Sequence, residues 1–276
     1  MTDLVGIALA AGAGTRLRPL TELRPKALCP VGNVALVDRA LEHLRGWTDD
    51  VAVNCHHLAD QIVTHVGATA HLSVERPRAL GTAGALGQLG AWIDGRDVLL
   101  VNADAYLTAP TGGGTLDRLM AGWDRQRCRL LVTPTDGGGD FVHDGAPVRY
   151  VGVCLLPWAS VSKLRAEPTG LYEVLWRPEL AAGRLDLVGH LGTAIDCGTP
   201  SDYLRANLHA SGGASVIGEG ATVDGDVERC VVWPGATVSA EEHLVECIRA
   251  GSAAEPMTVS APLGDAPTPA GDGATR

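Results

Sequence analysis

A glycine-rich turn near the start of the chain carries residue types suited to binding phosphate. It follows a short apolar run, Leu4–Leu9, which predicts a buried strand. Gly12 and Gly14 lack a Cβ atom, so the backbone there can turn sharply and approach a ligand. Backbone N–H groups in such a turn form an anion-binding concavity, and Arg16 and Lys26 add two cations. Together these features predict a polyphosphate-binding site.

Two common phosphate-binding motifs do not match this turn. A P-loop requires Gly-Lys-Ser/Thr after its spacer, and no such tripeptide follows either glycine. The dinucleotide-binding fingerprint requires a third small residue where this chain has Leu17. It also requires an acidic residue at the end of the second strand, but the strand Val51–Cys55 leads into His56 and His57. Both motifs are therefore disfavoured.

The turn and the segment after it resemble the signature of sugar-1-phosphate nucleotidylyltransferases, also called NDP-sugar pyrophosphorylases. That pattern reads L-A-G/A-G-x-G-T-R-L-x-P-L-T, then P-K-x-L-x-P-V, and the chain matches it over Leu9–Thr21 and Pro25–Val31. The resemblance implies catalytic roles for Arg16, Lys26 and Asp104. It also implies a nucleotide-binding set formed by Leu9, Ala11, Gly12, Gly14, Thr15, Arg16, Gly81 and Thr82.

Enzymes of this family join a sugar-1-phosphate oxygen to the α-phosphorus of a nucleoside triphosphate and release pyrophosphate. The attacking phosphate is already a nucleophile, so the protein must align two anions and neutralise developing charge. Mg²⁺ is the usual means, held by one or two carboxylates and phosphate oxygens. The resemblance assigns this metal to Asp104, after the strand Asp97–Val101, and to Asp196, within Ala194–Tyr203. Either aspartate alone is better explained as a turn or cap residue, but both match family motifs in the right order.

A second glycine-containing segment, Leu80–Leu86, resembles the family's L-G-T-A-G-A-L loop. The resemblance implies that Gly81 lets the backbone approach the nucleobase and that Thr82 caps the following helix. The segment by itself predicts only a glycine-rich helix start. Gly152 and Glu173 match the sugar-binding side of the family less closely, and a surface glutamate is an equal interpretation of Glu173.

Two further positions stay open. Asn54 ends the second strand, where it either contacts base or sugar, by resemblance, or serves as a turn asparagine. Many family members carry a Glu-Lys-Pro segment between the two aspartates, and its lysine contacts the sugar phosphate. Gly137–Tyr150 lacks that segment, as in shorter bacterial members, and no feature of the sequence establishes Arg149 as its substitute.

The elements that must position these residues alternate between strand and helix through about residue 210. Strands are predicted at Leu4–Leu9, Val51–Asn54, His71–Glu75, Asp97–Asn102, Arg129–Thr133 and Arg149–Leu156, and helices at 34–44, Thr82–Trp92 and Thr115–Arg127. This rhythm predicts a Rossmann-like α/β fold, with a mostly parallel sheet covered by helices. Ligands of such sheets bind beyond the carboxyl ends of the strands, where the glycine turn, Asn54 and Asp104 all fall.

The composition changes after residue 213. Ala214–Gly225 and Cys230–Val238 are β-branched, punctuated by glycine, and resemble hexapeptide turns of a left-handed parallel β-helix. About two coils are too few for an independent solenoid, so the module should pack on the main domain or on another subunit of a homo-oligomer. We therefore expect a nucleotidyltransferase domain over 1–212, a β-helix module over 213–250 and a disordered tail over 251–276.

Charge and composition restrict the ligand class. The 276 residues include 32 acidic residues and 22 Lys and Arg, for a formal net charge of −10. No basic run occurs, which favours a small phosphate ligand over nucleic acid. No apolar run approaches the roughly 20 residues that span a bilayer, and the first residues lack signal-peptide features. The seven cysteines are far apart without a C-x-x-C pair, which argues against zinc and favours a reducing cytoplasm.

The leading hypothesis is a Mg²⁺-dependent sugar-1-phosphate nucleotidylyltransferase. GTP with mannose-1-phosphate is favoured, because Pro25–Leu44 and Cys230–Val238 resemble guanylyltransferases with β-helix tails. UTP with an N-acetylhexosamine or N-acetylmuramate phosphate is the close alternative, given the Leu9–Gly12 variant and the missing Glu-Lys-Pro. A non-catalytic regulator that binds a nucleotide sugar is a third hypothesis, disfavoured because a sensor does not need the metal-binding pair. A β-helix acyltransferase is weaker still, since two coils form no long prism.

Overall fold

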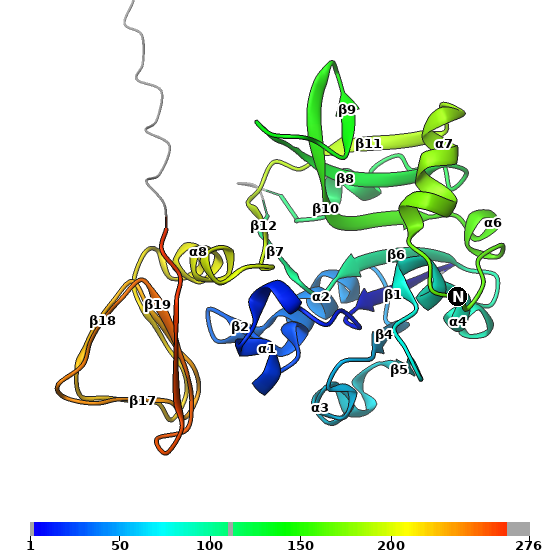
Figure 1. Ribbon diagram of the computed structural model, residues 1–276. Helices are drawn as coiled ribbons and strands as arrows, with labels where there is room; N and C mark the ends of the chain where they lie inside the picture. The colour runs from blue at the N-terminus through cyan, green and yellow to red at the C-terminus, as the bar shows by residue number, and fades with distance from the viewer. Residues whose placement is uncertain (1–2, 110–112, 264–276) are drawn as a thin grey trace, which may run out of the picture. The chain divides into compact units, whose positions relative to one another are not determined.

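The first part of the chain is built around an eight-stranded sheet (Figure 1). The computed structural model describes residues 3–109 and 113–263. Within the sheet the strand order is β11-β8-β10-β6-β1-β4-β5, and β9 pairs with β10. The strands are β1 Leu4–Leu9, β4 Val51–Cys55, β5 His71–Val74, β6 Asp97–Asn102, β8 Cys128–Pro134, β9 Phe141–His143, β10 Ala146–Leu156 and β11 Leu185–Gly189.

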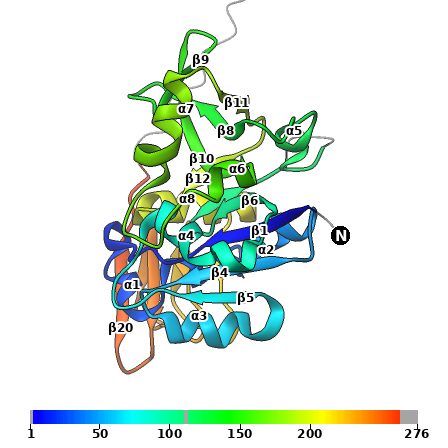
Figure 2. The ribbon, with the colours of Figure 1, turned by 90° about the vertical axis from the view of Figure 1, so that its right-hand side faces the viewer.

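Most of the pairs in this sheet are parallel, which confirms the predicted α/β class. β1 pairs in parallel with β4 and β6, β4 with β5, and β11 with β8. Figure 2 shows β5, β4, β1 and β6 lying one above another in this order. β10 runs antiparallel to β6, β8 and β9. A tight turn joins β9 to β10 at Asp144 and Gly145, both with positive φ, as a two-residue hairpin requires.

Helices cover both faces of the sheet because successive strand residues point to opposite sides. On β6, Leu99 and Val101 join the core cluster that contains residues of α2, α3 and α5. Val98 and Leu100 join the other cluster, with residues of α4 and α6. The helices are α2 Leu36–Arg45, α3 Ala59–Val66, α4 Gly81–Ile93, α5 Asp117–Met120, α6 Trp158–Val161 and α7 Arg177–Ala181.

The predicted helix over Thr115–Arg127 is wrong beyond its first turn. Only α5 forms, and the chain then turns at Gly122 (φ 61°) and Arg125 (φ 59°). The Asp124 carboxylate accepts hydrogen bonds from the backbone of Gln126 and Arg127, and these bonds with the Arg127 side chain lower the pKa of Asp124 to about 2. A side chain that bonds nearby backbone in this way offers an alternative to the helix.

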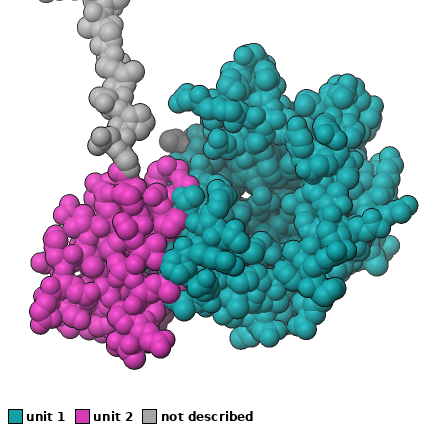
Figure 3. All heavy atoms as spheres, viewed as in Figure 1, with its two compact units in different colours: residues 1–199 teal, residues 200–276 magenta. Residues whose placement is uncertain are grey.

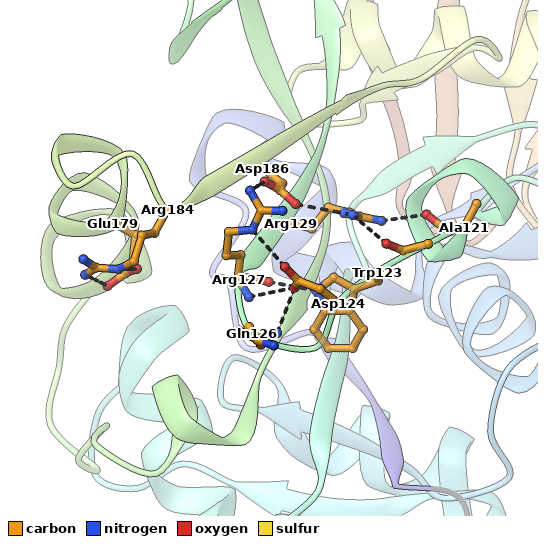
Figure 4. Close-up of polar contacts among 10 residues, drawn as sticks. Ala121, Trp123, Asp124, Gln126, Arg127, Arg129, Glu179, Arg184 and Asp186 are labelled. Atoms are coloured by element: carbon orange, nitrogen blue, oxygen red, sulfur yellow. Dashed lines mark hydrogen bonds and ion pairs between the residues drawn. The ribbon is translucent and has the colours of Figure 1, made fainter.

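Ion pairs and hydrogen bonds of two arginines connect the same loop to the edge of the sheet (Figure 4). Arg127 pairs with Asp186 of β11 at 2.9 Å, and Arg129 pairs with the same carboxylate at 3.3 Å. Arg129 also donates to the carbonyl oxygen of Ala121 at 2.8 Å. These contacts join the loop after α5 to β8 and β11, away from the carboxyl end of β1 where the glycine turn begins.

The described residues from Pro200 onward group as a second unit (Figure 3). The structure divides the chain after Thr199, whereas the predicted boundary lay after residue 212. The difference arises because helix α8, Pro200–Ser211, belongs with the short strands that follow it. Tyr203 of α8 is fully buried, and its hydroxyl accepts a hydrogen bond from Trp233 Nε1 at 3.0 Å.

Strands β13 to β19 of the second unit are short and stack in parallel. β13 pairs with β16, which pairs with β19, while β14 pairs with β17 and β15 with β18. Figure 1 shows the resulting triangular outline. The strands are β13 Val216–Ile217, β14 Thr222–Val223, β15 Asp226–Glu228, β16 Val231–Val232, β17 Thr237–Val238, β18 His243–Val245, β19 Cys247–Gly251 and β20 Pro256–Ser260.

The prediction of a disordered tail from residue 251 is wrong for the part that the structure describes. β20 pairs antiparallel with β19, from Cys247 opposite Ser260 to Gly251 opposite Pro256. The alternate residues Met257 and Val259 are half-buried. The composition of this segment did not predict a strand, because an Ala/Pro/Gly-rich segment has no backbone hydrogen-bond partners by itself. The outer edge of β19 supplies those partners. Residues 264–276 lie outside the described part of the chain.

Candidate active site

The two glycines of the predicted phosphate turn have different roles. Gly14 has φ 60°, and a Cβ there would lie 2.8 Å from Thr21 Cγ2 and 3.1 Å from Lys26 Cβ. Its carbonyl oxygen accepts bonds from Leu17 N and from the Thr21 hydroxyl, each at 3.0 Å. A Cβ at Gly12, by contrast, would meet no atom of the described residues within 4 Å. Only Gly14 is required by the turn itself.

Lys26 lies between the two predicted metal ligands. Its Nζ donates to Asp104 Oδ2 at 2.9 Å and to Asp196 Oδ1 at 3.1 Å. The lysine side chain is 7% exposed, whereas the two carboxylates are about half exposed. Arg16 adds a second cation, with its Nη2 3.1 Å from Asp196 Oδ2. Four of the predicted charged residues therefore meet at one place.

A short two-stranded sheet brings the two aspartates together. Asp104 lies between β6 and β7, Ala105–Leu107, and Asp196 ends β12, Ala194–Asp196. β7 and β12 pair antiparallel with Ala105 opposite Asp196. The Cys197 amide also donates to the carbonyl oxygen of Asp104 at 3.1 Å. The carboxyl end of β6 thus receives a second carboxylate from a distant segment of the chain.

Electrostatics favours the charged forms of Lys26 and Asp196. Burial by itself would lower the pKa of Lys26, but the charges and hydrogen bonds of Asp104 and Asp196 outweigh burial and raise that pKa. Burial would likewise raise the pKa of Asp196, but Lys26 and then Arg16 outweigh it, so that pKa is lowered. Lys26 and Asp196 are therefore stabilised in their charged forms.

Two adjoining hollows open on this cluster. The first, of about 180 Å³, is lined by Leu9, Ala10, Gly12, Gly14, Thr15, Arg16, Lys26, Ala27, Ala103, Asp104 and Gly198. The second, of about 190 Å³, is lined by Leu9, Ala11, Gly12, Asn54, Ala79, Gly81, Thr82, Asn102 and Asp104. Leu9, Gly12 and Asp104 line both. The structure therefore brings the predicted nucleotide-binding residues together around these two hollows. The first hollow is polar and cationic, and the second is bounded by backbone and small side chains.

The loop before α4 is anchored differently from the prediction. Gly81 has φ 68°, and a Cβ there would lie 2.7 Å from the carbonyl oxygen of Thr169. Thr82 does not cap α4, since its hydroxyl instead accepts a bond from the Leu171 amide at 2.8 Å. The predicted capping role is therefore wrong, because a distant backbone donor takes that oxygen. Thr82 still lines the second hollow.

The predicted sugar-side residues are less closely gathered. Gly152 has φ 89° in the irregular part of β10, and a Cβ there would lie 3.0 Å from the Cβ of Asn102, which lines the second hollow. Glu173 is exposed on the π-helical turn Tyr172–Trp176 and lines neither hollow. Arg149 is an exposed residue of β10 opposite Thr133. The sugar-binding roles of Gly152 and Glu173 stay predictions.

Sequence reasoning missed Glu75, which follows β5. Its carboxylate is 1% exposed and accepts bonds from Asn54 Nδ2 at 2.7 Å and from the Leu80 amide at 2.6 Å. Asn54 in turn accepts a bond from the Ala10 amide at 2.7 Å. The available signal was an acidic residue at the carboxyl end of a parallel strand, a position where ligands of such sheets bind.

The two aspartates suit a metal ion that binds together with a phosphate ligand. Among the described residues, no three His, Cys, Asp or Glu side chains form a metal-binding group. Asp104 and Asp196 nevertheless converge on one cation, the Lys26 ammonium. Mg²⁺ is commonly held by one or two carboxylates with phosphate oxygens supplying the rest, so two carboxylates are sufficient. Across the described residues, no helix is long and apolar enough to cross a membrane.

Comparisons with known proteins identify the family of the chain. Residues 6–192 match the MobA-like NTP transferase domain. The chain is 32% identical over 234 residues to N-acetylmuramate alpha-1-phosphate uridylyltransferase of Caulobacter vibrioides, covering 73% of this chain and 95% of that protein. It is 25% identical to mannose-1-phosphate guanyltransferase of Debaryomyces hansenii, covering 74% of this chain and 63% of that protein.

The fold also matches solved structures. One, titled mannose-1-phosphate geranyltransferase from Thermus thermophilus, superposes with a TM-score of 0.66 at 17% identity, covering 94% of this chain and 95% of that one. The chain therefore belongs to the MobA-like NTP transferase family, among the sugar-1-phosphate nucleotidylyltransferases that its motifs resemble.

Proposed function

We propose that this protein transfers a nucleoside monophosphate from a nucleoside triphosphate to a sugar-1-phosphate, with Mg²⁺ held by Asp104 and Asp196. The observation that carries the proposal is the meeting of Arg16, Lys26 and both aspartates at the mouth of the glycine-lined hollow. Phosphoryl chemistry of this kind needs alignment and charge neutralisation more than a side-chain nucleophile. The site offers both.

Each charged residue has a defined part in this scheme. Arg16 and Lys26 face the first hollow, where they would bind the triphosphate and neutralise negative charge as pyrophosphate leaves. The Gly12–Thr15 backbone would hold the phosphates at close range. Asp104 and Asp196 would hold the metal, which when bound supplies further charge neutralisation at the reacting phosphates. The sugar phosphate itself is the nucleophile.

The second hollow is the place we propose for the nucleobase and ribose. Its lining includes Asn54, Gly81 and Thr82, and the close approach of Gly81 to Thr169 keeps this wall free of a side chain. The sugar of the second substrate would extend toward Gly152 and Glu173 of the neighbouring segments. We propose that Glu173 contributes from the surface, since it lines neither hollow.

Two substrate pairs have support. UTP with N-acetylmuramate α-1-phosphate is favoured by a relative that this chain spans over 95% of its length at 32% identity. GTP with mannose-1-phosphate, which the sequence motifs favour, has support from a relative at 25% identity, of which the chain spans 63%. The first relative matches more strongly, so we propose the uridylyl pair first and the guanylyl pair second.

We further propose that the second unit is a short left-handed β-helix. Parallel pairing of successive short strands on three sides supports it, with Val216 beside Val231 and Val231 beside Ile248. Ala236 and Val238 are fully buried, as interior positions of such coils should be.

The test measures pyrophosphate release with UTP, GTP, ATP, CTP and dTTP, each against N-acetylmuramate, N-acetylglucosamine, mannose and glucose 1-phosphates. We expect turnover with one pair that depends on Mg²⁺ and falls roughly 100-fold in Asp104→Asn. Asp224→Asn, an exposed aspartate of the second unit, is the matched control and should keep wild-type activity. Absence of turnover over the whole panel, together with nucleotide-sugar binding in calorimetry, would instead support a regulatory homologue.

A further inference from the structure

A buried hydrogen-bonded chain connects the two walls of the second hollow. It runs from the Ala10 amide to Asn54 Oδ1 at 2.7 Å, and from Asn54 Nδ2 to Glu75 Oε1 at 2.7 Å. It ends where the Leu80 amide donates to Glu75 Oε2 at 2.6 Å. Ala10 belongs to the glycine turn, and Leu80 directly precedes Gly81. Two segments 70 residues apart are therefore held through two side chains.

The anchoring of Glu75 leaves its carboxylate little freedom. Its own amide donates to the carbonyl oxygen of Cys55 at 2.8 Å, and its carbonyl oxygen lies 3.0 Å from His56 Nδ1. Glu75 is 1% exposed and Asn54 is 2% exposed. The backbone nitrogen and oxygen of Glu75 and both of its side-chain oxygens therefore have partners, which fixes the carboxylate in one position. It therefore defines where its two side-chain donors lie.

We propose that Glu75 is a positioning residue that sets the spacing between the glycine turn and the Gly81 loop, and thereby shapes the nucleobase pocket. The atoms it connects belong to residues next to Leu9, Ala11 and Gly81, which line that hollow. Its identification as a nucleobase pocket rests on the proposed function. The geometric claim, that Glu75 holds the two walls together, does not.

The direction of the hydrogen bonds makes the proposal specific. Both ends of the chain are backbone N–H groups, which can only donate. The amide of Asn54 must therefore turn its oxygen to Ala10, and residue 75 must accept at both oxygens. In Glu75→Gln one buried donor faces another, whichever way the two amides are turned. A buried donor without an acceptor costs roughly 1–3 kcal/mol, or about 5- to 150-fold in an equilibrium.

A swapped pair restores every bond without changing net charge. In the double variant Asn54→Asp with Glu75→Gln, the introduced carboxylate would accept from the Ala10 amide and from the side-chain amide of the introduced glutamine. The oxygen of that glutamine would accept from Leu80. Asn54→Asp alone places two carboxylates face to face. Each single variant should therefore be impaired, and the double variant should recover. Glu219→Gln, an exposed glutamate of the second unit, is the control for loss of one charge.

The experiment measures KM and kcat for the nucleotide, its Kd by calorimetry, and amide hydrogen exchange over residues 9–12 and 79–82. We expect each single variant to raise KM and Kd by roughly tenfold with a smaller change in kcat, because uniform binding is lost. Exchange at Ala10 and Leu80 should rise in parallel. The double variant should return KM, Kd and exchange to within about threefold of wild type.

Other results would overturn the proposal. Wild-type KM and exchange in Glu75→Gln would show that the bonded chain does not hold the walls. If Glu75→Gln lost melting temperature and exchange protection but kept wild-type KM and Kd, Glu75 would be structural only. Failure of the double variant to recover any property would reject the donor–acceptor argument. If the wild type turns over no substrate, the proposed function fails, and the Kd for UTP or GTP with exchange still decides the role of Glu75.

Discussion

An added methyl group tests the two glycines of the phosphate turn separately. At one it would enter the space proposed for the ligand, and at the other it would collide with the protein. At Gly12 a Cβ would meet no atom of the described residues within 4 Å, yet this residue lines both hollows. At Gly14 it would meet Thr21 and Lys26 at 2.8 and 3.1 Å, on a backbone with φ 60°. The variants Gly12→Ala and Gly14→Ala should therefore fail in opposite ways.

The structure allows rough magnitudes for both variants. A non-glycine residue in the left-handed region costs roughly 1–2 kcal/mol, and the crowded methyl at Gly14 adds about 1 kcal/mol. For a domain of this size, 1 kcal/mol corresponds to about 2–4 °C, so Gly14→Ala should lower Tm by roughly 4–12 °C. At Gly12, whose φ lies outside that region, alanine should leave Tm unchanged or raise it slightly. Its methyl would displace a bound triphosphate, and a displacement of about 1 Å costs roughly 100-fold in rate.

The assay compares thermal unfolding with pyrophosphate release for both variants and the wild type. We expect Gly12→Ala to keep its Tm and lose kcat/KM, while Gly14→Ala loses Tm. Wild-type kcat/KM in Gly12→Ala would refute the assignment of these hollows to substrate. An unchanged Tm in Gly14→Ala would refute the view that glycine is required there by backbone conformation and by packing against Thr21.

Further perturbations test the metal ligands, one buried histidine and the last strand. Asp104→Asn and Asp196→Asn should each lower kcat roughly 100-fold with little change in Tm, since both carboxylates are half exposed. Calorimetry with Mn²⁺ and nucleotide should show weaker metal binding in each variant. Normal activity in either variant would exclude that aspartate from the metal site. Burial lowers the pKa of His190, so the unfolded chain binds protons more readily and the free energy of unfolding should fall as pH drops below about 6.5. Urea unfolding at several pH values measures this, and an unchanged slope in His190→Gln would assign the effect elsewhere. Ending the chain at Ala250 removes β20 and should destabilise the second unit in calorimetry; melting equal to that of the wild type would contradict the role of β20.

Local patterns were enough to identify the family and to predict much of the candidate site. The glycine turn, the two cations and the two aspartates occur in short motifs, each set by what a few adjacent residues can do. The strand–helix rhythm likewise predicted the sheet, since buried parallel strands are apolar runs readable one at a time. The helix expected after Thr115 failed because Asp124 bonds nearby backbone, a competition that hydrophobic spacing does not report.

Short motifs were therefore sufficient to name the residues that could bind phosphate and metal, and their order along the chain. Tertiary structure decided how they act together. Lys26 bridges carboxylates 78 and 170 positions away, and Glu75 joins Asn54 to Leu80. These features depend on pairing between segments distant in sequence, and such contacts form only when the sheet and its neighbouring strands bring those segments together.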